Sequence, residues 1–347
     1  MSSQVTDRMS FSERLENYRI FHVMLDSFHN MFDDEAKEYR KYIGQDFPDW
    51  RQLIPDASAH FVNSMPFIDF PRPMVPKTVP IGGIAVDMES IRSEKLPDDL
   101  DAILNVRPRN MFLSFGTLAK SSEMPVEFKR NLVSVFRAEQ NVTFIWKYES
   151  EDVAFAEGLE NVKFVKWVPQ TALLNDPRLT AFLSHGGLGS TNEAAFLGKP
   201  VIMVPIFADQ SRNANMLARQ GMAIALHKSD LGNLPKVRDA FHSILYDEKY
   251  RLTAERIAGM LEEMPVKPKE LMVKYVEFVG NYGPFPLMTP FSLQMPWYQR
   301  YNYDIYAYSS SFYVFTAGFV YFLKCLLSKV SARIVKKTHE KTDEKAD

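Results

Sequence analysis

The chain has 347 residues, a length that allows about two domains. Its hydrophobic content of 46% and charged content of 24% are typical of a globular protein, which excludes wholesale disorder and a fibrous repeat. A net charge of −2 lacks the basic excess of a general nucleic-acid binder, so we expect no nucleic-acid partner. The single cysteine, Cys325, excludes an internal disulfide and a cysteine-rich metal site, and we expect no metal.

The N-terminal segment predicts two helices and a short strand. Ser10 and Glu13 form a capping-box pattern, and apolar residues at helical spacing follow, so we expect an amphipathic helix over residues 11 to about 32. A second helix is expected over Asp34–Tyr42 and a strand over His60–Val62. Five prolines then fall between positions 66 and 80, and the Ile81-Gly82-Gly83-Ile84 run follows. Because proline removes a backbone donor and fixes φ, this stretch predicts an extended connection without regular structure.

From about residue 100, short apolar runs alternate with helical stretches. Strands are expected at Met111–Phe115, Val142–Trp146, Val162–Val165, Thr180–Ser184, Val201–Val204 and Ala223–Leu226. Helices are expected over Pro125–Glu139, near Thr171, Thr191 and Arg212, over Lys236–Tyr246, and in two further helices to Val279. Strand–helix alternation with continuous apolar runs predicts a parallel sheet covered on both faces, and hence an α/β, Rossmann-like domain. Ligands of such sheets bind at the carboxyl ends of the strands.

Polar and glycine residues follow two of these strand ends. Gly116-Thr117 comes after the first strand, and its hydroxyl suits a phosphate oxygen. His185-Gly186-Gly187-Leu188-Gly189-Ser190 comes after the fourth strand and opens a helix, whose N-terminal N–H groups favour an anion. The spacing matches neither the G-x-G-x-x-G fingerprint nor the G-x-x-x-x-G-K-[ST] loop. A nicotinamide dehydrogenase and a nucleoside triphosphatase are therefore disfavoured.

Two further pairs follow neighbouring strands. Trp167 offers a stacking face to a planar base and Gln170 offers an amide, whereas Asp209 and Gln210 can bond to sugar hydroxyls. Taken singly, each residue is more often structural, because a lone tryptophan usually packs in a core and an Asp-Gln pair usually lies in a solvated loop. Together they map to one edge of one sheet, and this favours a ligand site.

The stretch WVPQTALLNDPRLTAFLSHGGLGSTNEAAFLGKPVIMVPIFADQ resembles the signature of the UDP-glycosyltransferases, in their animal UDP-glucuronosyltransferase-like branch. The resemblance runs from about Phe11 to the C-terminal apolar segment and includes DFPRP, IGGI, LPDDL and SFGT. It implies a two-domain, GT-B-like fold. Residues 1–84 would be the last part of the acceptor domain with the proline-rich linker, and residues 85–285 the UDP-sugar-binding, Rossmann-like domain.

The resemblance implies a donor site for a UDP-sugar, which is a co-substrate, and no further cofactor. Trp167 would stack on uracil, Gln170 would hold the base or ribose, and Glu193 would bind the ribose hydroxyls. The residues implied for the diphosphate are Thr117, His185, Gly187 and Ser190, and those implied for the transferred sugar are Asp209 and Gln210. There are two departures from the family pattern: Gly189 stands where asparagine is usual, and Asp176 stands where histidine is common. We interpret the second as a surface difference.

The implied reaction transfers a hexosyl or glucuronosyl group, with inversion, to the hydroxyl of a small lipophilic acceptor. It needs a base for the acceptor proton. In the family a histidine oriented by an aspartate supplies it, but His22, His29 and His60 do not match that motif, so the catalytic base stays unknown. Two hypotheses remain open. The chain is an active UDP-glycosyltransferase, or it is an inactive, membrane-anchored protein that binds UDP-sugars or pairs with family members as a homo- or hetero-oligomer.

The C-terminal region predicts a membrane anchor. Residues 305–323 include no charged side chain, and their length is close to the roughly 20 residues that cross a bilayer. The alternative is a buried aromatic helix. Basic residues crowd the following tail, 324–347, which is typical of the cytosolic side, and 286–304 would be membrane-proximal. The resemblance implies the endoplasmic reticulum, with a lumenal domain if a longer precursor supplies a signal peptide. The sequence after Met1 lacks an apolar leader, so translation from there predicts a tail anchor instead.

Overall fold

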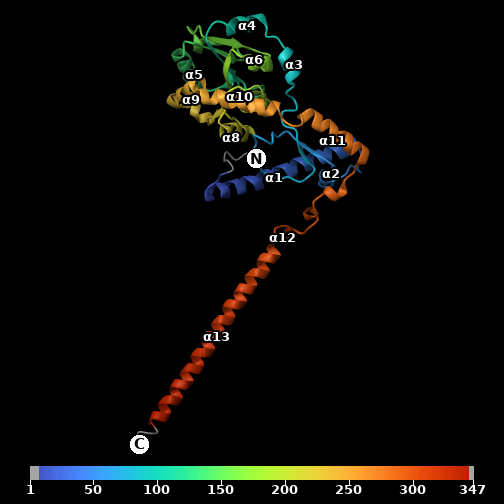
Figure 1. Cartoon of the computed structure of the whole chain (residues 1–347), viewed down its shortest axis with the longest axis vertical. Coiled ribbons are helices and arrows are strands. Elements are labelled where there is room, and N and C mark those ends of the chain that lie inside the picture. Colours follow the sequence, from blue (N-terminus) through green and yellow to red (C-terminus); the bar gives the residue numbers. More distant parts are fainter. Residues whose placement is uncertain (1–7, 344–347) are drawn as a thin grey trace. The chain divides into compact units, whose positions relative to one another are not determined.

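The computed structural model describes residues 8–343, with side chains as far as Arg333. The chain forms two compact units, Met1–Pro284 and Phe285–Asp347, and each is described by itself. The first unit holds a parallel sheet surrounded by helices, and the second is dominated by one long helix (Figure 1).

The N-terminal segment begins with one helix, α1 (Phe11–Tyr42), where the sequence predicted two. The capping box at its start is confirmed. The predicted break near Asp33 is wrong, because the sequence there holds neither glycine nor proline and the acidic side chains are paired. Asp33 accepts hydrogen bonds from Trp50 Nε1 at 2.8 Å and from Arg51 at 2.7 Å, both in α2 (Trp50–Asp56). The helix therefore continues through the acidic pair.

A two-stranded parallel sheet follows, formed by β1 (His60–Val62) and β2 (Thr78–Pro80). The first strand confirms the prediction. The second corrects it, since it lies inside the proline-rich stretch that was expected to lack regular structure. Pro80 is tolerated because it is the last residue of a short strand, where a missing donor breaks no central ladder. The linker is thus partly ordered against the N-terminal segment.

The main sheet has six strands, all parallel, and confirms the predicted α/β class. They are β3 (Arg109–Ser114), β4 (Val142–Lys147), β5 (Val162–Val165), β6 (Leu179–Ser184), β7 (Val201–Met203) and β8 (Ala223–Ala225). Their order is β5-β4-β3-β6-β7-β8, so the chain builds outward from β3 in one direction and from β6 in the other. Ligands of such sheets bind where the direction reverses, which places the expected site between β3 and β6.

Helices cover both faces of this sheet. They are α4 (Asp98–Leu104), α5 (Val126–Ala138), α6 (Gln170–Asn175), α7 (Leu188–Phe196), α8 (Gln210–Gln220), α9 (Leu234–Tyr246) and α10 (Glu248–Glu262). Two further helices are α3 (Met88–Ser93), which contacts α6, and α11 (Pro268–Tyr282), whose Tyr275 ring meets Phe61 of β1. One hydrophobic core lies between the sheet and α4, α6, α7, α8 and α10, and the other lies against α5 and α9. The helices predicted from the sequence are all present with small shifts at their ends.

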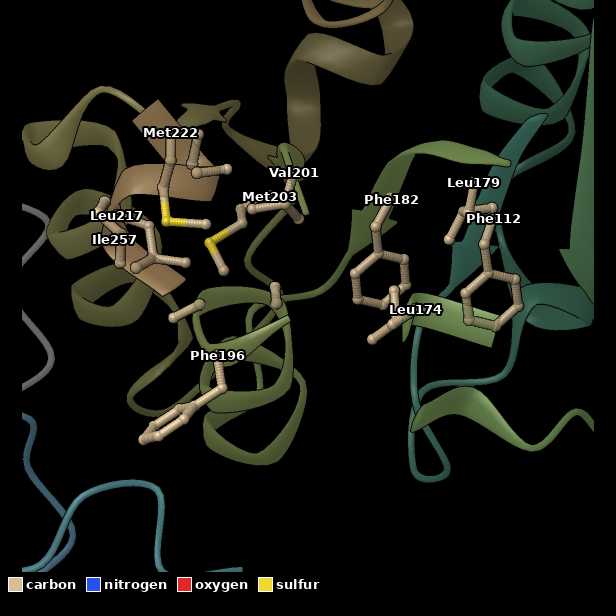
Figure 2. Close-up of a cluster of buried hydrophobic side chains, with 14 of the residues drawn as sticks. Phe112, Leu174, Leu179, Phe182, Phe196, Val201, Met203, Leu217, Met222 and Ile257 are labelled. Atoms are coloured by element: carbon tan, nitrogen blue, oxygen red, sulfur yellow. The ribbon is translucent and has the colours of Figure 1, made fainter. Parts of the chain in front are cut away.

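The strands alternate between the two cores, as a period of two requires. Phe112 and Phe182 belong to the first core, with their rings stacked 5.2 Å apart, whereas Met111 and Leu113 belong to the second. Figure 2 shows the first core, where Met203 of β7 lies near Leu217 of α8 and Met222 of the loop after it, and where Phe112 and Phe182 lie near Leu174 of α6. Burial on both faces fixes the register of the strands, and hence the positions of their carboxyl ends.

The second unit contains α12 (Trp297–Arg300) and α13 (Tyr303–Asp343). Residues Tyr303–Arg333 of α13 are long and apolar enough to cross a membrane, and none of this window is buried within the protein. The predicted membrane helix is thus present as a helix, longer than the uncharged run 305–323. The alternative of a buried aromatic helix does not hold in the described structure, since Phe312, Phe315 and Tyr321 are exposed.

Candidate functional site

Two adjacent strands, β3 and β6, are each followed by a turn of the same type. Ser114 at the end of β3 accepts a hydrogen bond from the N–H of Gly116 at 3.3 Å, and Ser184 at the end of β6 accepts one from Gly186 at 3.2 Å. Both glycines have a φ of 85°, a left-handed conformation that favours glycine. The repeated Ser-X-Gly turn redirects the chain at the point where the sheet order reverses. It therefore delivers Thr117 and His185 to the same edge of the sheet.

The imidazole of His185 lies between two glycines. A Cβ added to Gly116 would lie 2.6 Å from Cε1 of His185, and one added to Gly187 would lie 2.6 Å from Nε2. Only residues without a side chain leave room for the ring at these two positions. Nδ1 is buried and has no hydrogen-bond partner among the described residues. The glycines predicted to approach an anion thus also set the position of the histidine.

Burial lowers the pKa of His185 below its ordinary value; Asp209 opposes this shift and Lys147 adds to it. The ring is therefore neutral near pH 7, and it can donate one hydrogen bond but carries no charge. Positive potential comes instead from the N-terminus of α7, which begins at Leu188, and from Lys147 at the end of β4. Nζ of Lys147 donates to the carbonyl oxygen of Gly116 at 2.7 Å. Sequence reasoning missed Lys147, although a lysine that ends an apolar strand was a visible signal.

Three predicted residues meet in one cluster. Nε2 of Gln170, at the start of α6, donates to Ser190 Oγ at 2.9 Å and to Glu193 Oε2 at 2.6 Å, both on α7. Trp167 precedes α6 in the loop after β5, and its side chain is exposed, with a relative accessibility of 72%. Thr117 is exposed as well, and no contact ties it to the cluster. The side chain of Trp167 is thus open to solvent, three residues before Gln170 of the cluster.

The Asp209-Gln210 pair divides into an exposed residue and a buried one. Gln210 is buried, and its Oε1 accepts from the N–H groups of Ile206 and Phe207 at 2.8 and 3.0 Å. Its side chain therefore shapes the loop after β7, and only its Nε2 amide is left for a ligand. Asp209 is exposed at the start of α8. Its Oδ2 accepts from Asn213, a buried residue that sequence reasoning missed, although its position four residues after Asp209 was a signal.

The two departures from the family pattern, Gly189 and Asp176, lie in different surroundings. A Cβ at Gly189 would meet nothing within 4 Å, so this position is open. Asp176 corrects our expectation of a surface difference, because its side chain is only 12% exposed. Arg178 donates to both of its carboxylate oxygens, and these bonds lower the pKa of Asp176. The residue is part of the packing after α6.

Comparisons with known proteins show the family of the chain. The profile of the UDP-glucoronosyl and UDP-glucosyl transferase family matches residues 1–341. UDP-glycosyltransferase UGT5 of Dactylopius coccus is 28% identical over 87% of this chain and 56% of its own length. Human UDP-glucuronosyltransferase 1A8 is 27% identical over 92% of this chain and 58% of its own length. The chain therefore spans somewhat more than half the length of these relatives.

Solved structures show the same fold. A glycotransferase of kitacinnamycin has a TM-score of 0.56 at 18% identity, over 81% of this chain and 68% of its own. Os79 from O. sativa in complex with UDP has a TM-score of 0.54 at 22% identity, over 66% of this chain and 56% of its own. At these identities the likeness concerns the fold, which is the GT-B glycosyltransferase fold predicted from the sequence. With the family profile matching nearly its whole length, the chain belongs to the UDP-glucoronosyl and UDP-glucosyl transferase family.

Proposed function

We propose that the edge formed by β3, β6 and α7 binds a UDP-sugar and holds it for transfer of the sugar to a small lipophilic acceptor. The observation that carries this proposal is the meeting of Gln170, Ser190 and Glu193 beside the N-terminus of α7, next to His185. Family membership supports the UDP-sugar as ligand. The sugar, whether a hexosyl or a glucuronosyl group, and the acceptor are part of the proposal.

The diphosphate would lie at the N-terminus of α7. The first N–H groups of a helix have no partner within the helix, and the helix dipole favours negative charge there. His185 would donate one hydrogen bond from its neutral ring, with Thr117 and Ser190 supplying hydroxyls. Lys147 would add positive potential from the neighbouring strand, as its effect on the pKa of His185 indicates. Together these groups offer a diphosphate several donors.

The uridine would lie over Trp167, and the sugar would reach Asp209. Uracil would stack on the exposed face of Trp167, while Gln170 and Glu193, already bonded to each other, would take up the ribose hydroxyls. Asp209 would accept hydrogen bonds from hydroxyls of the transferred sugar.

In the proposed reaction the acceptor oxygen attacks the anomeric carbon from the side opposite the diphosphate. A new C–O bond forms, the bond to the diphosphate breaks, and configuration inverts. Negative charge grows on the leaving diphosphate, where the N–H groups of α7 and His185 stabilise it. The proton of the acceptor passes to a base that we do not assign. His22 and His29 pack against the rings of Tyr18 and Trp50, and we assign neither of them as the base.

We further propose that α13 anchors the chain in the endoplasmic reticulum membrane, with the basic tail 324–347 in the cytosol. The support is one helix of sufficient length and apolar character, with basic residues after the uncharged run. Association with a second copy or with related family members through the membrane would be compatible with this placement.

Titration calorimetry of UDP into the detergent-solubilised chain tests donor binding. Stacking on an aromatic side chain contributes about 1–3 kcal/mol, so Trp167→Ala should weaken UDP binding roughly 5- to 150-fold. Trp297→Ala is the matched control, because Trp297 is also exposed but lies in the other unit, and it should leave the affinity unchanged. A folded chain that takes up no UDP would refute the donor site. An unchanged affinity in Trp167→Ala would refute only the stacking.

Turnover separates the two hypotheses about catalysis. A general base contributes about 10²–10⁴-fold to such a reaction. We expect the purified chain, given a UDP-sugar and a phenolic acceptor, to show absent or very low transfer while still binding UDP. Rapid transfer would show that the chain is an active enzyme. One of the residues to which we assign no such role would then be the base.

A further inference from the structure

The DFPRP run takes no part in the donor site, yet its first residue is a buried acid. The side chain of Asp69 is only 4% exposed. Its carboxylate accepts hydrogen bonds from Ser64 Oγ at 2.5 Å, from the backbone N–H of Phe70 at 2.7 Å, and from the guanidinium of Arg212. A carboxylate removed from water is tolerated when it is paired and hydrogen-bonded. The pair therefore fixes Arg212 against the N-terminal segment.

The same segment holds α8 at both ends. Arg212 lies in the first turn of α8, and its guanidinium is 5.8 Å from the ring of Phe70. Gln220, the last residue of α8, donates from Nε2 to the carbonyl oxygen of Ile68 at 2.9 Å. Residues 68–70 thus contact the first and last turns of one helix. That helix cannot slide or rotate without breaking these bonds.

The first turn of α8 carries the polar groups at the sugar end of the proposed site. Asn213, next to Arg212, donates from Nδ2 to Asp209 Oδ2 at 2.8 Å and to the carbonyl oxygen of Gly186 at 3.0 Å. A small rotation of this turn would break the bond to Gly186, whereas the bond to Asp209 lies within the turn and would move with it. It would also change the distance between Asp209 and the loop that carries His185. The position of Asp209 therefore depends on what holds Arg212.

We propose that Asp69 is a positioning residue for the sugar end of the donor site. Acting through Arg212, it fixes the first turn of α8, so that Asp209 faces the sugar of a bound donor. This inference rests on the donor site proposed above. Asp69 would touch no donor atom, and among the described residues neither Asp69 nor Arg212 is hydrogen-bonded to α6, α7 or the loop after β5, where the uridine and the diphosphate would lie. The pair therefore governs recognition of the sugar and leaves recognition of UDP to the other elements.

The test compares the affinity for UDP with the affinities for UDP-glucose and UDP-glucuronic acid, using titration calorimetry on the full chain. Arg212→Met and Asp69→Asn should bind UDP within twofold of the parent chain, but the preferred UDP-sugar at least tenfold more weakly. Asp209→Ala should reproduce this pattern. The double variant Arg212→Met/Asp209→Ala should be no worse than Asp209→Ala, because both changes act on the same contact.

Arg178→Met is the matched control. Arg178 is a partly buried arginine that bridges Asp101 and Asp176, so its loss should lower the melting temperature but leave the ratio of UDP-sugar to UDP affinity unchanged. If Asp209→Ala changes this ratio while folded Arg212→Met and Asp69→Asn do not, the positioning role is wrong and the donor site stands. If these two variants lose UDP and UDP-sugar affinity equally, the Asp69–Arg212 pair has a structural role and the positioning role is wrong. If the parent chain binds no UDP, the proposed function itself fails.

Discussion

At the scale of single residues, the candidate site depends on its glycines as much as on its polar side chains. The sequence was sufficient to predict which residues lie at the sheet edge, because a strand end and a following glycine turn are local signals. It could not predict that the ring of His185 lies between Gly187 and Gly116, since Gly116 is far from the histidine in the chain. Nor could it show that Gln210 turns inward to the loop at Ile206.

Two glycines of the same motif allow a matched test of the position of His185. In Gly187→Ala the new methyl group collides with Nε2 of His185, whereas in Gly189→Ala it meets nothing within 4 Å. Hydrogen bonds to charged groups contribute about 1.5–3 kcal/mol, so displacing the ring should weaken UDP binding roughly 10- to 150-fold. We expect Gly189→Ala to bind UDP within twofold of the parent chain. Equal affinities for the two variants, measured by calorimetry, would contradict the placement of His185.

The lowered pKa of His185 makes the stability of the ligand-free protein depend on pH. Because burial favours the neutral ring, the folded pKa lies below the unfolded value of about 6.5. This contribution to stability is fully present above about pH 6.5 and is lost as the pH falls through the folded pKa. His185→Gln should therefore flatten the fall in melting temperature between pH 7.5 and 5. The exposed His22 serves as the control, and a profile that changes equally in His22→Gln would contradict this origin.

At the scale of secondary structure, the apolar runs predicted all six strands of the main sheet, and the four central strands, β3, β4, β6 and β7, are buried on both faces. The errors arose where long-range contacts decide the structure. Two helices were expected where one runs through the acidic pair, and Asp33 is paired there with Trp50 and Arg51 of the next helix. The strand in the proline-rich stretch exists only because β1 lies beside it.

The linker also contacts α7, and this contact can be tested with two glycines of similar backbone conformation. Gly83 and Gly158 have φ values of 83° and 78°, but a Cβ at Gly83 would collide with the ring of Phe196, and one at Gly158 would meet nothing within 4 Å. Left-handed strain alone should cost Gly158→Ala about 1–2 kcal/mol of unfolding free energy. Gly83→Ala should lose about 1–3 kcal/mol more through overpacking, as measured by chemical denaturation. Equal losses of unfolding free energy in the two variants would show that the linker does not pack against α7.

At the scale of the whole molecule, the chain combines an α/β unit, which we propose binds the donor, with a helix suited to a membrane. Composition and one uncharged run were sufficient to predict the second unit, because crossing a bilayer needs little beyond length and apolar side chains. The contacts of the N-terminal segment with the donor unit were not predictable from local signals. Asn63, for example, accepts a hydrogen bond from Asn192 of α7 at 3.1 Å, across 129 positions of sequence.

The membrane role of α13 predicts a position-dependent effect of charge. An arginine at the centre of a spanning helix costs about 2.5–3.5 kcal/mol of insertion free energy. Phe315→Arg, in the middle of the uncharged run, should therefore increase the fraction of the chain released from microsomes by alkaline carbonate. Ser331→Arg, among basic residues near the end of the span, should not. Release of the unaltered chain, or equal retention of Phe315→Arg, would contradict a spanning α13.

The central claim is that UDP lies at the carboxyl ends of β3 and β6, with uracil on Trp167. Photo-crosslinking with 5-azido-UDP-glucose, followed by mass spectrometry of the labelled peptides, locates the base directly. We predict that the label falls on the peptide containing Trp167 and Gln170, and that excess UDP prevents the labelling. Labelling that UDP does not prevent, or UDP-protected labelling confined to α1 or to the second unit, would contradict the proposed site.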